Sequence, residues 1–278
     1  MGVLIGLFRT AAVLFAIYCF LVAPNVVRRK LSHRQLTGRA YAHRGLHDKK
    51  IPENSLTAFE KAIQAGYGIE LDVRVTRDNV LVVHHDETLE RSCGDKRRVC
   101  DVALADLQQL SLFETQEYIP TFDEVLALVD GRVPLIIELK TDFSNKELAP
   151  QVYERLKRYK GVYCVESFDP FAMRWFKKHA PQVVRGQLSF MPPLKDKPLA
   201  ECLRRVALGY LLVNFLSRPD FVTYGYKSDA NLSFRFVANV FRPLLAAWTV
   251  KDEGVYQELQ KYYDIQIFEQ FRAPRENV

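Results

Sequence analysis

Short β-rich runs alternate with helix-period segments from residue 39 to the end of this 278-residue chain. The runs expected to form strands are Arg39–Arg44, Ile69–Val73, Pro134–Leu139, Val162–Ser167, Val183–Leu188, Leu211–Phe215, Leu245–Val250 and Asp264–Phe268. The segments expected to form helices between most of them are Ser55–Ala65, Phe122–Val129, Leu148–Tyr159, Pro170–His179 and Glu253–Tyr262. This α/β alternation predicts a TIM (β/α)8 barrel, which typically needs about 250 residues. A doubly wound open sheet is the alternative, but polar residues lie late in several different strands, which favours the barrel.

One stretch breaks the alternation. The second strand is followed by Thr76–Asn79 and then by the apolar run that begins at Val80. About four turn residues cannot make a parallel crossover, so this stretch is predicted to be a hairpin. Val80–His85 is therefore an excursion, residues through Leu110 form an inserted loop and short helix, and the barrel resumes at Thr121.

Two of the expected helices have start signals. Asn54 is a candidate N-cap for the helix that begins near Ser55. Thr121 and Glu124 have the Thr-x-x-Glu spacing of a capping box.

The N-terminal segment Val3–Val27 is apolar apart from Arg9, Thr10 and Asn25. Its length and composition predict a transmembrane helix, with Arg9 close enough to one end to reach the interface. A cleaved signal peptide is the alternative, but that expects positive charge before the apolar core. Residues 1–27 are therefore predicted to be an anchor, 28–38 a basic linker and 39–278 the barrel domain.

The basic residues that follow the apolar segment predict its orientation. They begin at Arg28-Arg29-Lys30 and continue through His33, Arg34 and Arg39, within a chain of formal charge +6. By the positive-inside rule, this flank favours a single-pass protein of the cell membrane whose catalytic domain is cytoplasmic. Cys93 and Cys100 flank a polar loop and could form a disulfide in an exported domain, or remain thiols in the cytoplasm. Two unpaired surface cysteines are an equally good interpretation.

Chemistry-bearing residues stand at the ends of four expected strands. His43-Arg44-Gly45 combines a proton carrier with a phosphate clamp. Glu70 and Asp72, two residues apart in a strand, point to the same side, where two carboxylates favour a bound Mg²⁺ or Ca²⁺ over zinc. Structural salt bridges to nearby arginines would also explain them.

The hairpin and the third parallel strand supply the remaining candidates. Of His84 and His85, the second is preferred because Asp86 follows it and could orient its ring. Glu138 is the candidate third metal ligand, and Lys140 faces the same way as a phosphate contact. A buried Glu138–Lys140 ion pair without a catalytic role is the alternative.

Three segments together resemble the glycerophosphodiester phosphodiesterase family, in its membrane-anchored bacterial type: YAHRGLHDKKIPENSLTAFEKAI, GIELDVRVTRDNVLVVHHDETLER and PLIIELK. The resemblance covers residue 39 to the C-terminus and implies a TIM barrel with one divalent cation, Mg²⁺ or Ca²⁺. It implies His43 and His85 as catalytic residues, and Glu70, Asp72 and Glu138 as metal ligands. Arg44 and Lys140 are implied as phosphate contacts, and Phe168 and Trp248 as the lining of a glycerol pocket. Two departures are Lys251, where the family often has Asn, and Glu269, where the last strand typically ends in Thr-Asp.

The expected reaction is hydrolysis of a glycerophosphodiester to glycerol 3-phosphate and an alcohol, with His43 as base and His85 as acid. The histidines could exchange these roles, and the nucleophile could be water or the glycerol 2-hydroxyl. Phospholipase C- or D-like cleavage of a membrane lipid is one alternative, and a catalytically inactive lipid-binding barrel is another. Nucleic-acid binding is disfavoured because the basic residues lie beside the anchor. They do not form a patch in which basic and aromatic residues alternate. The expected partners are the small substrate and, through the N-terminal helix, the membrane, with no obligate protein partner evident.

Overall fold

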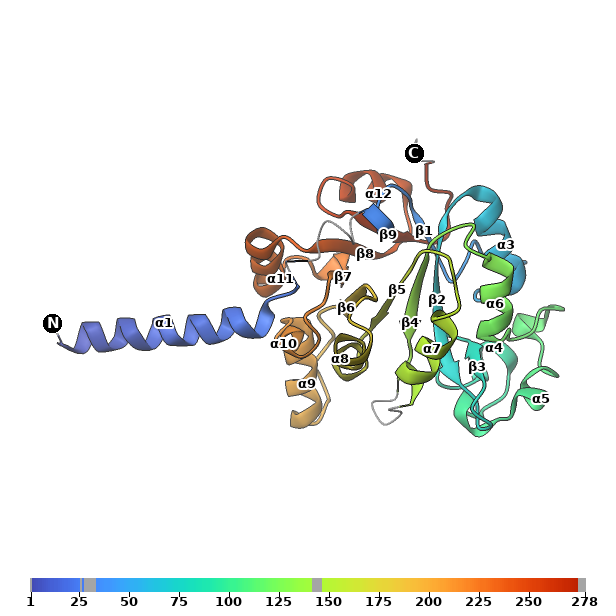
Figure 1. Cartoon of the computed structure of the whole chain (residues 1–278), viewed down its shortest axis with the longest axis horizontal. Coiled ribbons are helices and arrows are strands. Elements are labelled where there is room, and N and C mark those ends of the chain that lie inside the picture. Colours follow the sequence, from blue (N-terminus) through green and yellow to red (C-terminus); the bar gives the residue numbers. More distant parts are fainter. Residues whose placement is uncertain (1, 26, 28–33, 142–146, 275–278) are drawn as a thin grey trace.

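In a computed structural model of the chain, eight parallel strands of the described residues close into a barrel (Figure 1). The structure describes residues 2–25, 27, 34–141 and 147–274. The barrel strands are β1 (Tyr41–His43), β2 (Gly68–Val75), β4 (Leu135–Leu139), β5 (Tyr163–Ser167), β6 (Arg185–Ser189), β7 (Phe221–Gly225), β8 (Leu244–Val250) and β9 (Ile265–Phe268). Closure comes from β1, which pairs with both β2 and β9. The predicted TIM barrel is confirmed.

Helices follow the strands and cover the outside of the barrel. They are α3 (Leu56–Ala65), α6 (Phe122–Val129), α7 (Leu148–Leu156), α8 (Pro170–His179), α9 (Leu199–Gly209), α10 (Asn214–Ser217), α11 (Leu232–Phe236), the π-helical η4 (Val237–Phe241) and α12 (Glu253–Leu259). The capping box predicted for α6 is present, because Thr121 and Glu124 each bond the other's backbone N–H. The N-cap predicted for α3 was one residue early, since the side chain of Ser55 accepts from Ala58 N. Asn54 instead turns its amide toward Asp72.

The hairpin excursion after the second strand is also confirmed. Strand β3 (Leu81–Val83) runs antiparallel to β2, with Val73 opposite Val83. The insert that follows contains the short helices α4 (Glu90–Cys93), η1 (Val99–Asp101), α5 (Leu104–Leu107) and η2 (Leu112–Glu114). It has an apolar cluster of its own, which includes Val82, Leu89 and Leu107. The insert is therefore a small packed layer, and it holds the end of β3 in a defined position.

The sixth strand of the barrel was predicted in the wrong place. Leu211–Phe215 forms a turn and the start of α10, whereas the strand β7 lies at Phe221–Gly225. Short apolar runs do not distinguish strands from helices by periodicity alone. Here the apolar run serves helix packing: Leu211 is buried, and α10 packs against α8. The true strand is rich in aromatic and β-branched residues, and the short 3₁₀-helix η3 (Tyr226–Ser228) follows it.

The interior of the barrel changes from apolar to acidic along the strands. Ile136 and Cys164 belong to the interior apolar cluster, which also contains Tyr41 and Phe221. Because side chains alternate with period two, the residues two positions further on, Glu138 and Glu166, also point inward. Both carboxylates are buried. The apolar cluster therefore fills the N-terminal half of the barrel and leaves the C-terminal half for a polar site.

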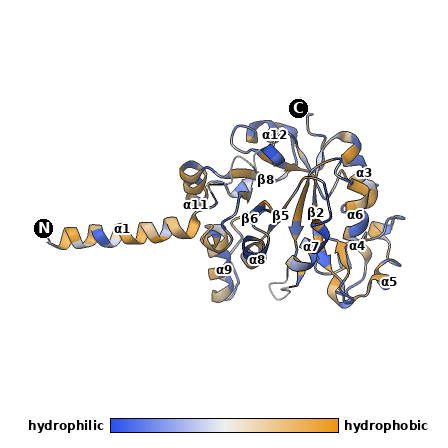
Figure 2. Ribbon diagram, in the orientation of Figure 1, coloured by the Kyte–Doolittle hydropathy of each residue, from blue (hydrophilic) through white to orange (hydrophobic). Residues whose placement is uncertain are grey.

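The N-terminal helix α1 (Gly2–Val22) extends away from the barrel (Figure 1). Among the described residues it is the one helix long and apolar enough to cross a membrane: Val3–Val22 has a mean hydropathy of 2.1. Figure 2 colours the ribbon of α1 as hydrophobic along most of its length. Such a helix near an N-terminus fits a membrane span or a signal sequence. Arg28-Arg29-Lys30 and His33, on which the predicted orientation depends, lie outside the described residues.

Candidate active site

Three carboxylates meet inside the barrel near the C-terminal ends of β2 and β4. Glu70 and Asp72 share one face of β2, and the parallel register sets Asp72 beside Glu138. All three side chains are buried, and one oxygen of each lies within 4.8 Å of the others. The structure thus brings together the three residues that the sequence singled out as metal ligands.

Two cations lie among these carboxylates. Lys140 Nζ is 2.8 Å from Glu138 Oε2 and 3.1 Å from Asp72 Oδ1, and Arg44 Nε is 3.3 Å from Asp72 Oδ2. Burial alone would raise the pKa of Asp72, but Lys140 and Arg44 outweigh it and hold that pKa well below its usual value. Burial and repulsion from Asp72 raise the pKa of Glu70 well above its usual value. The cluster therefore keeps one firmly ionised carboxylate and has an excess of negative charge.

The donor set fits a hard divalent cation. It consists of three buried carboxylates, and oxygen ligands of this kind suit Mg²⁺ and Ca²⁺. Asp72 Oδ1 has Lys140 as an ion-pair partner but accepts no hydrogen bond from the described residues, so it retains a lone pair for a ligand. The ion pair predicted as the alternative role of Glu138 is present as well.

A tight turn after β1 places Arg44 over the carboxylates. Arg44 and Gly45 both have positive φ, at 54° and 81°. The turn aims the backbone N–H of Arg44 at Glu70 Oε2, 3.1 Å away, while the guanidinium reaches Glu53 at 2.7 Å. Position 45 requires glycine, because a Cβ there would lie 2.9 Å from the backbone of Ala58.

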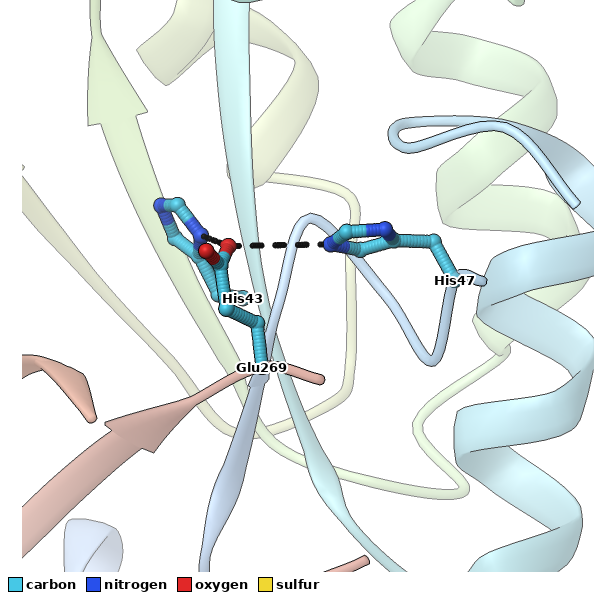
Figure 3. A group of neighbouring side chains, drawn as sticks. All are labelled: His43, His47 and Glu269. Carbon is cyan, nitrogen blue, oxygen red and sulfur yellow. Dashed lines mark hydrogen bonds and ion pairs between the residues drawn. The ribbon is translucent and has the colours of Figure 1, made fainter. Parts of the chain in front are cut away.

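His43 forms a close pair with a carboxylate from the last strand. Its Nδ1 lies 2.6 Å from Glu269 Oε2 (Figure 3). Its Nε2 lies 3.9 Å from Glu70 Oε2. Glu269 also contacts His47 Nε2 at 3.7 Å and Lys251 Nζ at 2.6 Å. Burial would raise the pKa of Glu269, but the hydrogen bond from His43 and the nearby His47 lower it below its usual value. Glu269 is thus an ionised partner that holds the Nδ1 proton of His43 and leaves Nε2 facing the carboxylates.

His85 forms the second histidine–carboxylate pair. Its Nδ1 is 2.6 Å from Asp86 Oδ1, the contact expected from their adjacency in sequence. Arg91 from α4 binds the other oxygen of Asp86 at 2.5 Å, and Arg74 binds the His85 carbonyl. Burial lowers the pKa of His85 to about 4. His84 is buried against Ser92 and the Asp86 carbonyl, so its ring holds the insert in place.

Three aromatic side chains pack edge-to-face beside the site. The ring centroids of Phe168 and Trp248 are 5.6 Å apart, and Phe190 lies 5.7 and 5.8 Å from them. The first two were expected from the sequence, whereas Phe190 was not. Phe190 follows β6 directly, and an aromatic residue just after a strand was the signal that could have identified it.

Comparison with known proteins places this barrel in a family. The model of the glycerophosphoryl diester phosphodiesterase family matches residues 43–267, most of the chain. The chain belongs to this family.

Curated relatives match part of their length. A glycerophosphodiester phosphodiesterase of Caldanaerobacter subterraneus subsp. tengcongensis is 37% identical over 161 residues, which cover 53% of this chain and 65% of the relative. One of Bacillus altitudinis is 37% identical over 131 residues, which cover 45% of this chain and 49% of the relative. The matched part of the chain therefore spans about half to just under two thirds of the length of these relatives.

Solved structures match the fold over most of the chain. A glycerophosphodiester phosphodiesterase of Thermotoga maritima has a TM-score of 0.63 at 27% identity and covers 82% of this chain and 93% of its own. A phosphodiesterase of Oleispira antarctica, solved with the product sn-glycerol-3-phosphate, has a TM-score of 0.68 at 23% identity and covers 84% of this chain and 93% of its own. At this level of identity, the second likeness concerns the fold.

The two departures from the family pattern meet at one point of the site. Lys251 follows β8 and Glu269 follows β9, and their side chains form an ion pair with each other. Glu269 nevertheless contacts His43, so an acidic contact exists at the end of the last strand. Sequence reasoning missed this pairing, and it also missed Glu53, which joins Arg44 to Arg91.

Proposed function

We propose that this family member hydrolyses glycerophosphodiesters to glycerol 3-phosphate and an alcohol. The observation that carries the proposal is the arrangement of two histidine–carboxylate pairs around three buried carboxylates and two cations. Burial raises the pKa of the Asp72 carboxyl group, and the nearby Lys140 and Arg44 lower it. Both histidines lower this pKa further, by smaller amounts. We expect a phosphodiester bound at these carboxylates to be within reach of His43 and His85.

Glu70, Asp72 and Glu138 would hold one Mg²⁺ or Ca²⁺ ion. When bound, the cation neutralises charge on the phosphoryl oxygens and orients the diester. Lys140 and Arg44 contribute further positive charge beside the phosphate. Phe168 and Trp248 supply an apolar wall for the glycerol carbon chain.

The histidines manage the two protons of the reaction. Glu269 holds a proton on His43 Nδ1, so His43 Nε2 has a lone pair that can accept the proton of the attacking oxygen. Asp86 holds Nδ1 of His85 in the same way, so a protonated His85 can deliver its Nε2 proton to the departing alkoxide. The new P–O bond forms as the bond to the alcohol breaks. The anionic phosphodiester would raise the pKa of His85 and so keep that proton in place.

The test is a substrate assay with the purified full chain. Glycerophosphoethanolamine with Mg²⁺ or Ca²⁺ should yield glycerol 3-phosphate and ethanolamine in equal amounts. Absence of turnover with several glycerophosphodiesters and several divalent cations would contradict the proposal, and retained ligand binding would then favour an inactive lipid-binding barrel.

A phospholipid substrate is the second candidate, because an apolar helix adjoins the barrel. Intact phospholipid in mixed micelles, assayed beside glycerophosphoethanolamine, separates the two. Faster release of the head group from the intact lipid would favour phospholipase C- or D-like cleavage.

We also propose that α1 stays attached as a single membrane span, with the barrel in the cytoplasm. The division into an anchor at 1–27, a basic linker at 28–38 and a barrel at 39–278 follows from this proposal. Support comes from the specific contacts between the end of α1 and the barrel, such as the bond from Asn214 Nδ2 to the Val22 carbonyl at 2.9 Å. A segment removed as a signal peptide has no need of such contacts. The N-terminal sequence of the mature protein tests this directly.

A further inference from the structure

The last turn of α1 is bonded to the barrel. Arg218 Nη1 donates to the carbonyls of Phe20 and Ala23, both at 2.8 Å, and its guanidinium lies 4.6 Å from the centre of the Phe20 ring. Asn25 Nδ2 donates to Asp220 at 2.8 Å. Carbonyls at a helix C-terminus lack partners within the helix, and a positive charge there is favourable. The end of α1 therefore has a defined position on the barrel.

The contact continues further up α1. The ring centroid of Phe236, at the end of α11, lies 5.8 Å from that of Phe15 and 5.3 Å from that of Tyr18. Tyr18 also donates to Ser233 Oγ at 2.8 Å. The barrel thus touches α1 from Phe15 onward, well inside the apolar segment.

The length of the apolar segment makes this contact informative. A span needs about 20 residues to cross roughly 30 Å of hydrocarbon. Val3–Val22 just meets this length. If the membrane ended where the barrel contact begins, only Val3–Leu14 would remain, which rises roughly 18 Å at about 1.5 Å per residue. An α1 that spans the membrane therefore brings the barrel elements around Phe236 into the lipid interface.

Those elements carry exposed apolar side chains. On α9, Leu199 and Leu203 are one helical turn apart and are 75% and 61% exposed. Leu232 on α11 and Val240 on η4 are also exposed. Ser233 connects the two groups, because its hydroxyl accepts from Tyr18 of α1 and donates to the carbonyl of Tyr210, directly after α9.

The orientation of α9 suits a membrane surface. In Figure 1, α9 runs across the direction of α1, so it lies parallel to a bilayer that α1 crosses. The exposed Arg204, Arg235 and Arg242 lie on the same helices or next to them. Apolar side chains flanked by basic ones are the composition that binds the interface of a bilayer with anionic lipids.

We propose that the exposed apolar side chains of Leu199, Leu203, Leu232 and Val240, here called the ledge, are inserted in the lipid interface beside α1. This inference rests on the proposed membrane span. The ledge and the span together fix the barrel on the bilayer in one orientation. Ser189, the residue before Phe190, donates to the carbonyl of Leu208 on α9 at 2.8 Å. The helix that carries Leu199 and Leu203 is therefore bonded beside the aromatic cluster of Phe168, Phe190 and Trp248.

Tryptophan fluorescence in reconstituted vesicles tests the ledge. The full chain would carry Leu203→Trp, Phe8→Trp or Tyr262→Trp, one at a time, in vesicles of phosphatidylcholine and phosphatidylglycerol with a nitroxide-labelled lipid as quencher. The emission of the unsubstituted protein, from Trp175 and Trp248, is subtracted. Phe8 reports on the span, and Tyr262, which is 67% exposed and lies after α12, is the matched control on the barrel.

We expect the emission added by Leu203→Trp to be quenched at least about twofold more than that added by Tyr262→Trp. Equal quenching at these two positions, with strong quenching at Phe8→Trp, would overturn the ledge and leave the span intact. Weak quenching at all three positions would overturn the span and the ledge together. Activity is measured separately, so a chain without phosphodiesterase activity would leave this result unchanged.

Discussion

Glu269 Oε2 lies 2.6 Å from Nδ1 of His43, although the two residues are 226 positions apart in the chain. The pair joins the first and last strands of the barrel at the point where it closes. A carboxylate in this position orients the ring and stabilises the imidazolium that forms when Nε2 accepts a proton.

Glu269→Gln should therefore lower kcat by roughly tenfold to a thousandfold with a small change in KM, because the amide keeps the geometry but removes the charge. The matched control is Lys251→Met, which removes the partner of the other Glu269 oxygen and should retain most activity. Steady-state kinetics at several pH values check this. A Glu269→Gln enzyme with an unchanged kcat and pH profile would rule out a positioning role.

His85→Ala should reduce turnover of glycerophosphoethanolamine by several orders of magnitude while metal content stays unchanged. The proton of a general acid matters most for a poor leaving group. A diester with a nitrophenol leaving group should therefore be far less affected by His85→Ala than by His43→Ala. The reverse order would exchange the roles of the two histidines, and near-normal activity of His85→Ala with both substrates would exclude it from catalysis.

Glu70→Gln should weaken binding of Mg²⁺ or Ca²⁺, because one of the three clustered carboxylates loses its charge. Titration calorimetry of the metal-free protein measures the affinity. Glu60→Gln is the control, since Glu60 forms an exposed ion pair with Arg132 far from the carboxylates. Identical metal titrations for the two variants would show that Glu70 is not a ligand.

The metal-free protein should lose stability as the pH falls from about 6.5 to about 4. Burial lowers the pKa of His85 from 6.5 to about 4, so in this range the unfolded chain binds a proton that the folded chain does not. The effect on the free energy of unfolding is on the order of 1–2 kcal/mol, because the side chain is partly exposed. Urea denaturation of the protein and of His85→Gln at several pH values measures the difference. If the free energy of unfolding of His85→Gln depends on pH as steeply as that of the unsubstituted protein, the pH dependence belongs to other groups.

An impermeant thiol reagent should leave Cys93 and Cys100 unlabelled in intact cells and label them after permeabilisation. Both are partly exposed thiols in the structure, so only the membrane would protect them from the reagent. A Cys93→Ser/Cys100→Ser variant identifies any labelling of other cysteines. Labelling of these two positions in intact cells would place the barrel outside.

Local patterns in the sequence were enough to predict most of the barrel and much of its site. Side chains alternate between the two faces of a strand, which placed Glu70 and Asp72 on one face of β2. The connection after β2 is too short for a parallel crossover, which predicted the β2–β3 hairpin. The capping box at Thr121 was equally local. These features depend on residues a few positions apart, so the order of amino acids determines them.

Other features required the tertiary structure. Leu211–Phe215 is a short apolar run, and such a run can form either a strand or a helix. Its packing partners in the folded chain decide between the two, and here they select a turn and the start of a helix. The pairing of His43 with Glu269 exists only because the barrel closes, and α1 meets Phe236 only because α11 folds back beside it. The sequence by itself determined which residues have the chemistry and which strands present them. The closed barrel decided their partners, because contacts between distant segments depend on packing that no local pattern encodes.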